Sequence, residues 1–423
     1  MAQWIESLRQ RGLVYQHTPL PEAPHLIKAA YVGIDPTADS LHVGHLVPLQ
    51  LLYHLAQLGI QPIVVIGGAT ARIGDPSGKR TERPLLPPEV VELNTQQLIQ
   101  QVQKILPLSL TILDNYAWLG EMSLVSFLRD VGKHITVSYL LTKETIHSRL
   151  EGGISFTEFS YPLLQAYDFY HLFVSYGCSL QVGGADQWGN ITTGIEFIHK
   201  QTGGEAYGIT CPLLTRADGS KFGKSEQGEN IWLSASKTSP YKFYQFWIRQ
   251  PDADMLRLLS IFSFRTLEEI HELWTMHQQS PEQRLAQRAL AYEMTSRVHG
   301  EAAAKIVKEV SEVVYGVGSL EALENISEGF FEQIVAEMPT YIIASSEISV
   351  AEALVQSGFL RSKSECRQLI QQGGLSINRQ RVRAENTPLS AYKPLRERYW
   401  LLQRGKKHQA WLRAELRGKR ESL

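Results

Sequence analysis

Residues 31–45 read YVGIDPTADSLHVGH, and this stretch decides the fold. The apolar segment Ala29–Ile34 predicts a buried strand, which runs through a turn into the helical segment Leu41–Leu58. We expect Asp39 and Ser40 to cap that helix. The unpaired N–H groups and the helix dipole would then attract an anion, so the stretch predicts a phosphate site beyond the end of a strand.

His42 and His45 stand three residues apart on one face of this predicted helix. Their rings are expected to donate hydrogen bonds to phosphoryl oxygens, and Gly44 leaves room for a flat base against the backbone. A pair of histidines at this spacing is also found in structural and metal-binding roles, so the pair alone does not decide a function.

Apolar runs bounded by turn residues alternate with amphipathic stretches from about residue 28 to residue 215. This rhythm predicts an α/β fold with a parallel sheet, whose ligands bind beyond the carboxyl ends of the strands. The expected strands are Ala29–Ile34, Ile63–Gly67, Leu110–Leu113, Leu180–Val182 and Tyr207–Cys211, with helices that include Leu41–Leu58 and Pro88–Ile105.

The pattern becomes helical between about residues 239 and 314. The candidate helices are Tyr241–Arg249, Met255–Ile261, Leu267–Gln278 and Pro281–Val298. Residues 315–345 are expected to be a loosely structured connector. A small third unit follows, with helical Val350–Ser357 and Lys363–Gln371 before a strand at Leu375–Ile377.

A second cluster, ADGSKFGKS at residues 217–225, follows the last expected strand of the sheet. Lys221 and Lys224 on a glycine-containing loop would close over a polyphosphate and neutralise a leaving pyrophosphate. Most loops of this kind are simply solvated, so this cluster too is weak evidence when taken alone. GDPSGKR at residues 74–80 is not a P-loop, because only three residues separate its glycines and Arg80 occupies the Ser/Thr position.

Charge is distributed unevenly along the chain. Residues 341–423 hold 16 Lys and Arg against 7 Asp and Glu, while the whole chain has a net charge of −1. Such a basic segment suggests contact with a polyanion, although a solvated basic tail has the same composition. The three cysteines have no metal-ligand or disulfide-framework spacing, and no segment has the length and apolar character of a leader or a membrane span, so we expect a cytoplasmic protein.

Together the HVGH and KFGKS motifs, about 180 residues apart around one sheet, resemble the HIGH and KMSKS signatures of class I aminoacyl-tRNA synthetases. Further stretches resemble the bacterial-type tyrosyl-tRNA synthetases and extend the similarity over essentially the whole chain. They are IGDPSGK at residues 73–79, FTEFSYPLLQAYDF at 156–169 and GGADQWGNI at 183–191.

This resemblance implies the roles of particular residues. A phenol pocket needs buried polar groups that satisfy its hydroxyl, and the resemblance assigns these to Tyr31 and Asp168. The tyrosine-binding set is Tyr31, Asp75, Tyr161, Gln165, Asp168 and Gln187. The catalytic set is His42, His45, Lys221 and Lys224, and the ATP-binding set is Asp35, Thr37, Gly44, His45, Lys79, Arg83, Gly184, Asp186 and Lys224.

The resemblance also implies a Rossmann-like catalytic domain (1–228) with a dimerisation insert near 116–150, an all-helical domain (229–320), a linker (321–345) and a small α+β RNA-binding domain (346–423). The implied partners are L-tyrosine, ATP with Mg²⁺, tRNA(Tyr) and a second copy of the chain, with no metal ligated by the protein and no membrane. RNA contacts are expected at Arg361, Lys363, Arg367, Arg379, Arg381 and Arg383.

Two other interpretations are open. One is a different adenylate-forming enzyme, such as a tryptophanyl enzyme or a free nucleotidyltransferase. The Tyr31 and Asp168 pair disfavours the first, and the basic C-terminal unit disfavours the second. The other is an RNA-binding structural protein on a decayed scaffold, which the intact histidines and lysines disfavour. One departure from the family is Val32, where many members carry a cysteine that touches the ribose, so we expect modestly weaker ATP binding.

Overall fold

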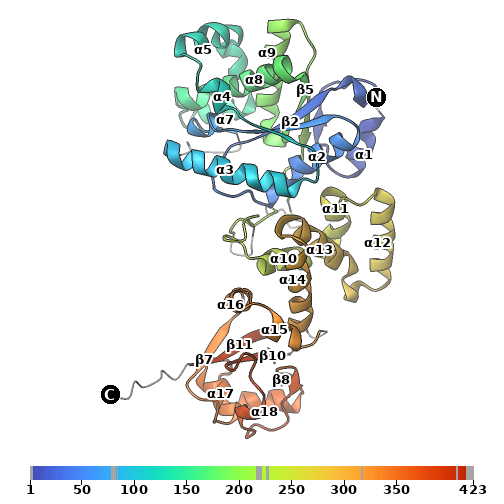
Figure 1. Ribbon diagram of the computed structural model, residues 1–423, viewed down its shortest axis with the longest axis vertical. Coiled ribbons are helices and arrows are strands. Elements are labelled where there is room, and N and C mark those ends of the chain that lie inside the picture. Colours follow the sequence, from blue (N-terminus) through green and yellow to red (C-terminus); the bar gives the residue numbers. More distant parts are fainter. Residues whose placement is uncertain are drawn as a thin grey trace. The chain divides into compact units, whose positions relative to one another are not determined.

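The computed structural model describes residues 3–77, 82, 84–215, 222–224, 228–315, 318–405 and 408–415. These residues form two compact units, one made of Met1–Thr238 with Phe246–His299 and the other of Ser239–Gln245 with Gly300–Leu423 (Figure 1).

The first unit is built on a six-stranded sheet with the order β1-β6-β5-β2-β3-β4. All neighbouring strands are parallel except β1, which pairs antiparallel with β6. Chain progression reverses between β2 and β5, and such a switch point opens a crevice at the carboxyl ends of parallel strands. The strands are β1 (Gln16–His17), β2 (Ala29–Ile34), β3 (Gln61–Ile66), β4 (Thr111–Asp114), β5 (Cys178–Gly184) and β6 (Tyr207–Cys211).

The central strands are apolar because both of their faces are buried. Five of six residues in β2 and in β3 are buried, the pattern expected of a parallel sheet covered on both sides. On the face that carries Tyr31, Ile63 and Val65, the sheet packs against Phe169 and Leu172 of α8 and Ile198 of α9. The predicted α/β fold class is confirmed, with the strands at Ala29–Ile34 and Tyr207–Cys211 at their predicted bounds.

The long helices of this unit are amphipathic segments that cover the sheet. Helices α8 and α9 lie side by side (Figure 1), and α2 contacts four of the strands. Four short helices between β4 and α8 form a separate layer, whose Val131, Ile135 and Leu140 pack against α8 and α9. The bounds are α1 (Trp4–Gln10), α2 (Leu46–Gln57), α3 (Pro88–Ile105), α4 (Tyr116–Leu119), α5 (Leu124–Asp130), α6 (Val137–Leu141), α7 (Glu144–Leu150), α8 (Phe156–Tyr176) and α9 (Trp188–Thr202).

The helical stretch predicted after the sheet is present, as α10 (Pro240–Ile248), α11 (Asp252–Phe262), α12 (Leu267–Gln279), α13 (Leu285–His299) and α14 (Glu301–Val314). Helices α11 to α13 belong to the same compact unit as the sheet, and α14 belongs to the second unit. Compactness alone does not define domains, so the division into domains made from the sequence stays a prediction.

The second unit contains a five-stranded sheet with the order β7-β11-β10-β8-β9. Residues 321–345, expected to be a linker, form two helices and the strand β7, which pairs in parallel with β11 some 70 residues later. Arg396 and Arg398 bind acidic side chains of α16, so this segment packs against the sheet. The elements are α15 (Glu321–Asn325), α16 (Glu328–Ala336), β7 (Thr340–Ile343), α17 (Val350–Gln356), α18 (Lys363–Gln371), β8 (Leu375–Ile377), β9 (Gln380–Arg381), β10 (Tyr399–Arg404) and β11 (His408–Ala414).

A buried ion pair fastens α7 to the start of α8. Arg149 Nη2 donates to Glu158 Oε2 over 2.8 Å, and the two side chains are 5% and 0% exposed. Replacing Arg149 by alanine leaves the Glu158 carboxylate buried without its counter-charge, and such losses cost about 3–5 kcal/mol. We expect R149A to lose free energy of unfolding of this size in urea titrations followed by tryptophan fluorescence.

The matched control is R9A, which removes the arginine of an exposed pair with Glu6. Exposed pairs contribute about 0–1 kcal/mol, so R9A should unfold close to the wild-type urea concentration. Equal losses in the two variants would show that the buried pair does not stabilise this layer.

Candidate active site

The HVGH motif follows β2 (Ala29–Ile34) after an irregular turn at residues 35–41. His42 precedes the one-turn 3-10 helix η2 (Val43–His45), which leads into α2. His42 Nδ1 accepts from Gly44 N over 3.1 Å, and His45 Nδ1 accepts from His42 N over 3.1 Å. The two imidazoles therefore cap the turn reciprocally.

The expectation that Asp39 and Ser40 cap this helix is wrong. Asp39 forms an ion pair with Lys237 over 2.7 Å, and the Ser40 hydroxyl donates to the carbonyl of Leu41. Both side chains are thus occupied before the helix begins, and the cap falls to His42.

The capping bonds fix the tautomers of both histidines. A ring nitrogen that accepts a backbone N–H carries a lone pair, so each neutral ring holds its proton on Nε2. The ring centroids are 3.9 Å apart. Burial, together with the nearby His42 ring, holds the pKa of His45 well below its ordinary value of 6.5, so His45 is neutral at pH 7 and Nε2 remains a donor.

The second motif lies against the first. Ile231 N donates to Gly223 O over 2.9 Å, and Val43 N donates to Ile231 O over 3.0 Å. Gly223 has φ of +86°, and a Cβ at this glycine would come within 3.7 Å of Gly44 N. Lys224 pairs with Asn230 in the same ladder. The structure thus brings Lys224 to the HVGH turn, while Lys79, Arg83 and Lys221 lie outside the described residues.

A buried pair of oxygen-bearing side chains stands between β2 and α8. The Tyr31 hydroxyl is buried without a hydrogen-bond partner, and its ring packs 5.3 Å from that of Phe169. The Asp168 carboxylate, 4% exposed, accepts from Asn115 Nδ2 over 2.9 Å and from Trp118 Nε1 over 2.7 Å.

Burial decides the protonation of this pair. It raises the pKa of Asp168 from 3.8 to about 7, although the two donors act in the opposite direction. Burial, with a smaller contribution from the charge of Asp168, raises the pKa of Tyr31 well above 10. The Tyr31 hydroxyl therefore keeps its proton and can donate it.

Sequence reasoning missed Asn115 and Trp118. Asn115 directly follows β4, and a polar residue at the end of a parallel strand is a signal for a site residue. Sequence reasoning also missed Gln181, whose buried Oε1 has no partner and which pairs in register with Tyr31 on the neighbouring strand. Trp118 carried no comparable signal.

A second polar cluster adjoins the carboxyl ends of β3 and β5. Gln187 Nε2 donates to Asp75 Oδ2 over 2.8 Å. Asn190, also missed, lies with Nδ2 3.1 Å from Gln165 Oε1 and from Gln187 Oε1, while its buried Oδ1 lacks a partner. The cluster thus gathers three of the predicted tyrosine-binding side chains around one amide.

Asp35 binds one further predicted residue, Tyr161, and the unpredicted Thr70. The Tyr161 hydroxyl donates to Asp35 Oδ2 over 2.9 Å, and Thr70 Oγ1 donates to Asp35 Oδ1 over 2.7 Å. Thr37 is exposed on the following turn. Beyond β5, Asp186 folds back over Gly184, where a Cβ would meet Asp186 Oδ1 at 2.7 Å.

The predicted RNA-binding residues all belong to the second unit. All except Arg379 are exposed. Lys363 pairs with Glu352 over 3.0 Å, and Arg367 pairs with Glu385 over 2.7 Å. Arg379 stands at the left-handed turn between β8 and β9, and its guanidinium donates to the Gly318 carbonyl.

Within the part of the chain that the structure describes, His, Cys, Asp and Glu nowhere gather in threes around a possible metal position. Among the helices formed by described residues, none has both the length and the apolar character needed to cross a membrane.

Comparison with protein families explains this arrangement. The model described as "tRNA synthetases class I (W and Y)" matches residues 27–316, and that of the "Tyrosine--tRNA ligase SYY-like C-terminal domain" matches residues 331–412. The sheet, its switch point and the two adjoining motifs are thus those of a class I aminoacyl-tRNA synthetase.

Similar proteins narrow the family further. The tyrosine–tRNA ligase of Amoebophilus asiaticus is 45% identical over 96% of this chain and 98% of its own length, and that of Geobacillus stearothermophilus is 43% identical over 95% and 97%. A C-terminally truncated mitochondrial tyrosyl-tRNA synthetase of Aspergillus nidulans superposes with a TM-score of 0.66 and 31% identity, covering 73% of this chain and 93% of that one. The chain belongs to the tyrosine–tRNA ligases of the class I synthetase family.

The raised pKa of Asp168 predicts a pH-dependent stability. Between about pH 4 and pH 7 the folded state keeps a proton on Asp168 that the unfolded state has lost, so the free energy of unfolding falls as pH rises through this window. D168N lacks this titration. We therefore consider the free energy of unfolding of D168N minus that of wild type. This difference should rise by at most ~4 kcal/mol between pH 4 and pH 7.5.

Urea titrations at several pH values measure this difference. The titration of groups that both proteins share cancels, so the pH dependence of the difference reports on Asp168. The amide introduced in D168N meets the donors Asn115 Nδ2 and Trp118 Nε1 at every pH, so its effect on them adds a constant offset. A difference that stays flat across the window would show that Asp168 ionises in the folded protein as it does in the unfolded chain.

Proposed function

We propose that the chain activates L-tyrosine with ATP at this site, forming tyrosyl-adenylate and pyrophosphate, and then transfers the tyrosyl group to the 3′-terminal adenosine of tRNA(Tyr). One observation supports tyrosine as the amino acid. The buried Tyr31 hydroxyl has no hydrogen-bond partner, and it lies close to the buried Asp168 carboxylate. A buried polar atom is costly when left unpaired, so the pocket favours a ligand that supplies the missing group.

The phenol of the substrate fits both side chains. Its oxygen accepts from the Tyr31 hydroxyl, and its proton is donated to Asp168. Asn115 and Trp118 already donate to Asp168, which leaves the carboxylate oriented to accept. Phenylalanine would leave the buried Tyr31 hydroxyl unpaired and would offer Asp168 no further donor. Rejection of phenylalanine by tyrosyl enzymes, roughly 10⁵-fold, is the general example of this effect.

The ammonium group of the substrate tyrosine is assigned to the polar cluster of Asp75, Gln165, Gln187 and Asn190. Asp75 supplies the charge, and Gln165 and Tyr161 supply further oxygens. Support comes from the hydrogen bonds that Gln187 and Asn190 make to Asp75 and its neighbours. These bonds hold the acceptors in place before the substrate binds, which reduces the ordering needed on binding.

The tyrosine carboxylate is already an anion and attacks the α-phosphorus of ATP directly, so pyrophosphate leaves without a covalent enzyme intermediate. The protein aligns the reactants and stabilises the charge that builds up on the phosphates. His42 and His45 donate through Nε2, and Lys224 adds a positive charge. Lys79, Arg83 and Lys221 are assigned to the same phosphates from the sequence alone.

The nucleotide is assigned to the carboxyl ends of β2 and β5. The exposed Gly44 is assigned to the base, and Asp186, which lies beside Gly184, is assigned to the ribose. Asp35 and Thr37 are assigned to the same nucleotide. Mg²⁺ enters as part of the ATP complex, where it neutralises phosphate charge.

The second unit is assigned to the RNA. Its candidate contacts are Arg361, Lys363, Arg367, Arg381 and Arg383, which are exposed, and the partly buried Arg379. The ion pairs of Lys363 and Arg367 would have to open before these two side chains bind phosphate. Arg361, Arg381 and Arg383 are therefore the stronger candidates. A cytoplasmic location, predicted from the sequence, is part of the same proposal.

Amino-acid-dependent ATP–pyrophosphate exchange tests the pocket. We expect exchange with tyrosine and none above background with phenylalanine or tryptophan. Y31F removes one neutral hydrogen bond to the phenol, so kcat/KM for tyrosine should fall roughly threefold to tenfold relative to that for phenylalanine. Y170F, on the same side of the sheet, removes a hydroxyl with no assigned contact to substrate and serves as the control.

Exchange with tryptophan, or with none of the three amino acids, would overturn the proposed function. Unchanged selectivity in Y31F would remove Tyr31 from the pocket while leaving the overall reaction intact.

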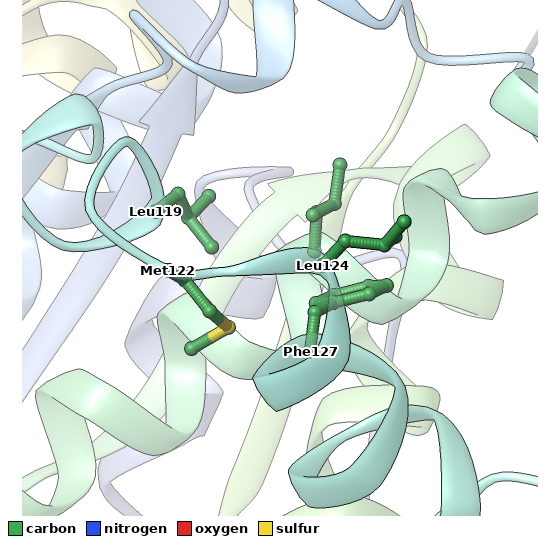
Figure 2. A pocket seen from close by; sticks show the side chains of 5 residues that line it. Leu119, Met122, Leu124 and Phe127 are labelled. Atoms are coloured by element: carbon green, nitrogen blue, oxygen red, sulfur yellow. The ribbon is translucent and has the colours of Figure 1, made fainter.

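We assign the apolar layer between β4 and α8 to a two-fold dimer interface. Leu124, Val125 and Leu128 of α5 are 70%, 72% and 48% exposed, an unusual concentration for a solvated helix. Beside them is an apolar cavity of about 270 Å³, lined by Leu119, Met122, Leu124, Phe127 and Leu164. Figure 2 shows the labelled side chains around it. In a two-fold interface the same patch meets its own copy, so one apolar surface is sufficient.

Sedimentation velocity tests this assignment. Wild type should sediment as a dimer, and the double variant V125D/L128D should sediment as a monomer, because the carboxylates would be buried in an apolar contact. L93D changes a residue of α3 that is 55% exposed elsewhere on the same unit and should leave the dimer intact. A dimeric V125D/L128D would show that the interface lies elsewhere.

A further inference from the structure

Helix α3 carries two amide side chains that point inward. Asn94 and Gln101 are seven residues apart, which places them on one face of the helix. Asn94 is only 4% exposed and Gln101 is half-buried, whereas the other glutamines of the helix are exposed, namely Gln96, Gln97, Gln100 and Gln103. Amides that turn away from solvent in this way need partners within the protein.

Both amides bind the backbone of the turn that precedes His42. Asn94 Nδ2 donates to Pro36 O over 3.0 Å. Gln101 Nε2 donates to Asp39 O over 3.2 Å, and Gln101 Oε1 accepts from Leu41 N over 2.9 Å. The Gln101 amide thus donates and accepts at alternate residues, as a neighbouring β-strand would.

The turn at residues 35–41 has no regular secondary structure of its own. Its N–H and C=O groups must therefore be satisfied by side chains, by other backbone or by water. Gln101 satisfies one carbonyl and one N–H where the turn approaches the HVGH motif, and its Oε1 also accepts from the Ser40 hydroxyl over 3.3 Å.

The backbone ladder continues directly from these bonds. Leu41 O accepts from Leu233 N over 2.8 Å, and His42 pairs with Trp232. The adjoining rung joins Ile231 to Gly223, the residue before Lys224. Gln101 therefore occupies the outer edge of a ladder that carries both His42 and Lys224.

We infer that Gln101, supported by Asn94, is a positioning residue for adenylate formation, acting through the backbone of Asp39 and Leu41 on His42, His45 and Lys224. This inference rests on the phosphate-binding roles proposed above for those three side chains. Loss of the amide leaves the turn held by fewer bonds, so the imidazole donors move relative to the phosphates. Tyrosine binding is spared, because Tyr31 and Asp168 are held by β2 and α8.

The test compares Q101A with Q100A, which changes the adjacent exposed glutamine of the same helix. We measure tyrosine-dependent ATP–pyrophosphate exchange, tyrosine binding by equilibrium dialysis and thermal unfolding. Q101A should lower kcat for exchange by about 10- to 100-fold, since a misplacement of about 1 Å can cost 10²-fold. The Kd for tyrosine should stay within about twofold of wild type, and Q100A should match wild type throughout.

Q101E is the conservative variant. Its carboxylate still accepts from Leu41 N but no longer donates to Asp39 O, so its kcat should lie between those of Q101A and wild type. Should Q101A fail to fold, Q101E against wild type gives the same comparison, with a lower kcat and an unchanged tyrosine Kd expected.

Two results would overturn the inference: a kcat for Q101A within twofold of Q100A, or a loss of tyrosine binding in parallel with the loss of kcat. H45A in the same assay separates this failure from a failure of the proposed function. If H45A exchanges as fast as wild type, the proposed role of the histidine fails. If H45A is slow while Q101A is normal, only the role of Gln101 fails.

Discussion

A backbone ladder between residues 41–43 and residues 231–233 is the contact on which the rest of the site depends. Hydrogen bonds from Val43 N to Ile231 O and from Ile231 N to Gly223 O bring together two motifs that are about 180 residues apart in the chain. Backbone bonds fix distance and direction at once, without the rotamer freedom of a side-chain contact. The two imidazoles and Lys224 therefore stay together only while this ladder holds, and their proposed binding of one set of phosphates depends on it.

The proposed specificity for tyrosine depends on a different feature, which is the burial of polar atoms. Tyr31 and Asp168 lie in a region where an unpaired hydroxyl or carboxylate is costly, and the fold compensates for this only in part. Asn115 and Trp118 each donate to Asp168, but nothing in the described structure satisfies the Tyr31 hydroxyl. A phenol can supply the missing partner and a benzene ring cannot, so in the proposed pocket an incomplete hydrogen-bond network would select for tyrosine.

The sequence predicted the parts of the fold that depend on local patterns. Strands such as Ala29–Ile34 are continuous apolar runs, and buried parallel strands require this composition. The strand β7 was missed because its TYII sequence is partly exposed and its partner lies some 70 residues later. Trp118 was missed for a similar reason, since its role depends on Asp168, which is 50 residues away. The predicted Asp39 and Ser40 cap was wrong because Lys237 and Leu41, which are not visible as partners in the sequence, bind those side chains.

The histidine tautomers indicate what kind of chemistry the site is built for. Because both Nδ1 atoms accept backbone N–H groups, the rings meet the crevice with Nε2 donors and offer no lone pair to accept a proton. The low pKa of His45 keeps that ring neutral, so in the proposed reaction it would act on a phosphoryl oxygen by hydrogen bonding and add no full charge. A reaction that begins with an ionised carboxylate needs no general base. A departing pyrophosphate needs hydrogen-bond donors and positive charge, which the histidine Nε2–H groups and Lys224 could supply. The arrangement suits charge stabilisation at phosphorus and is poorly suited to proton abstraction.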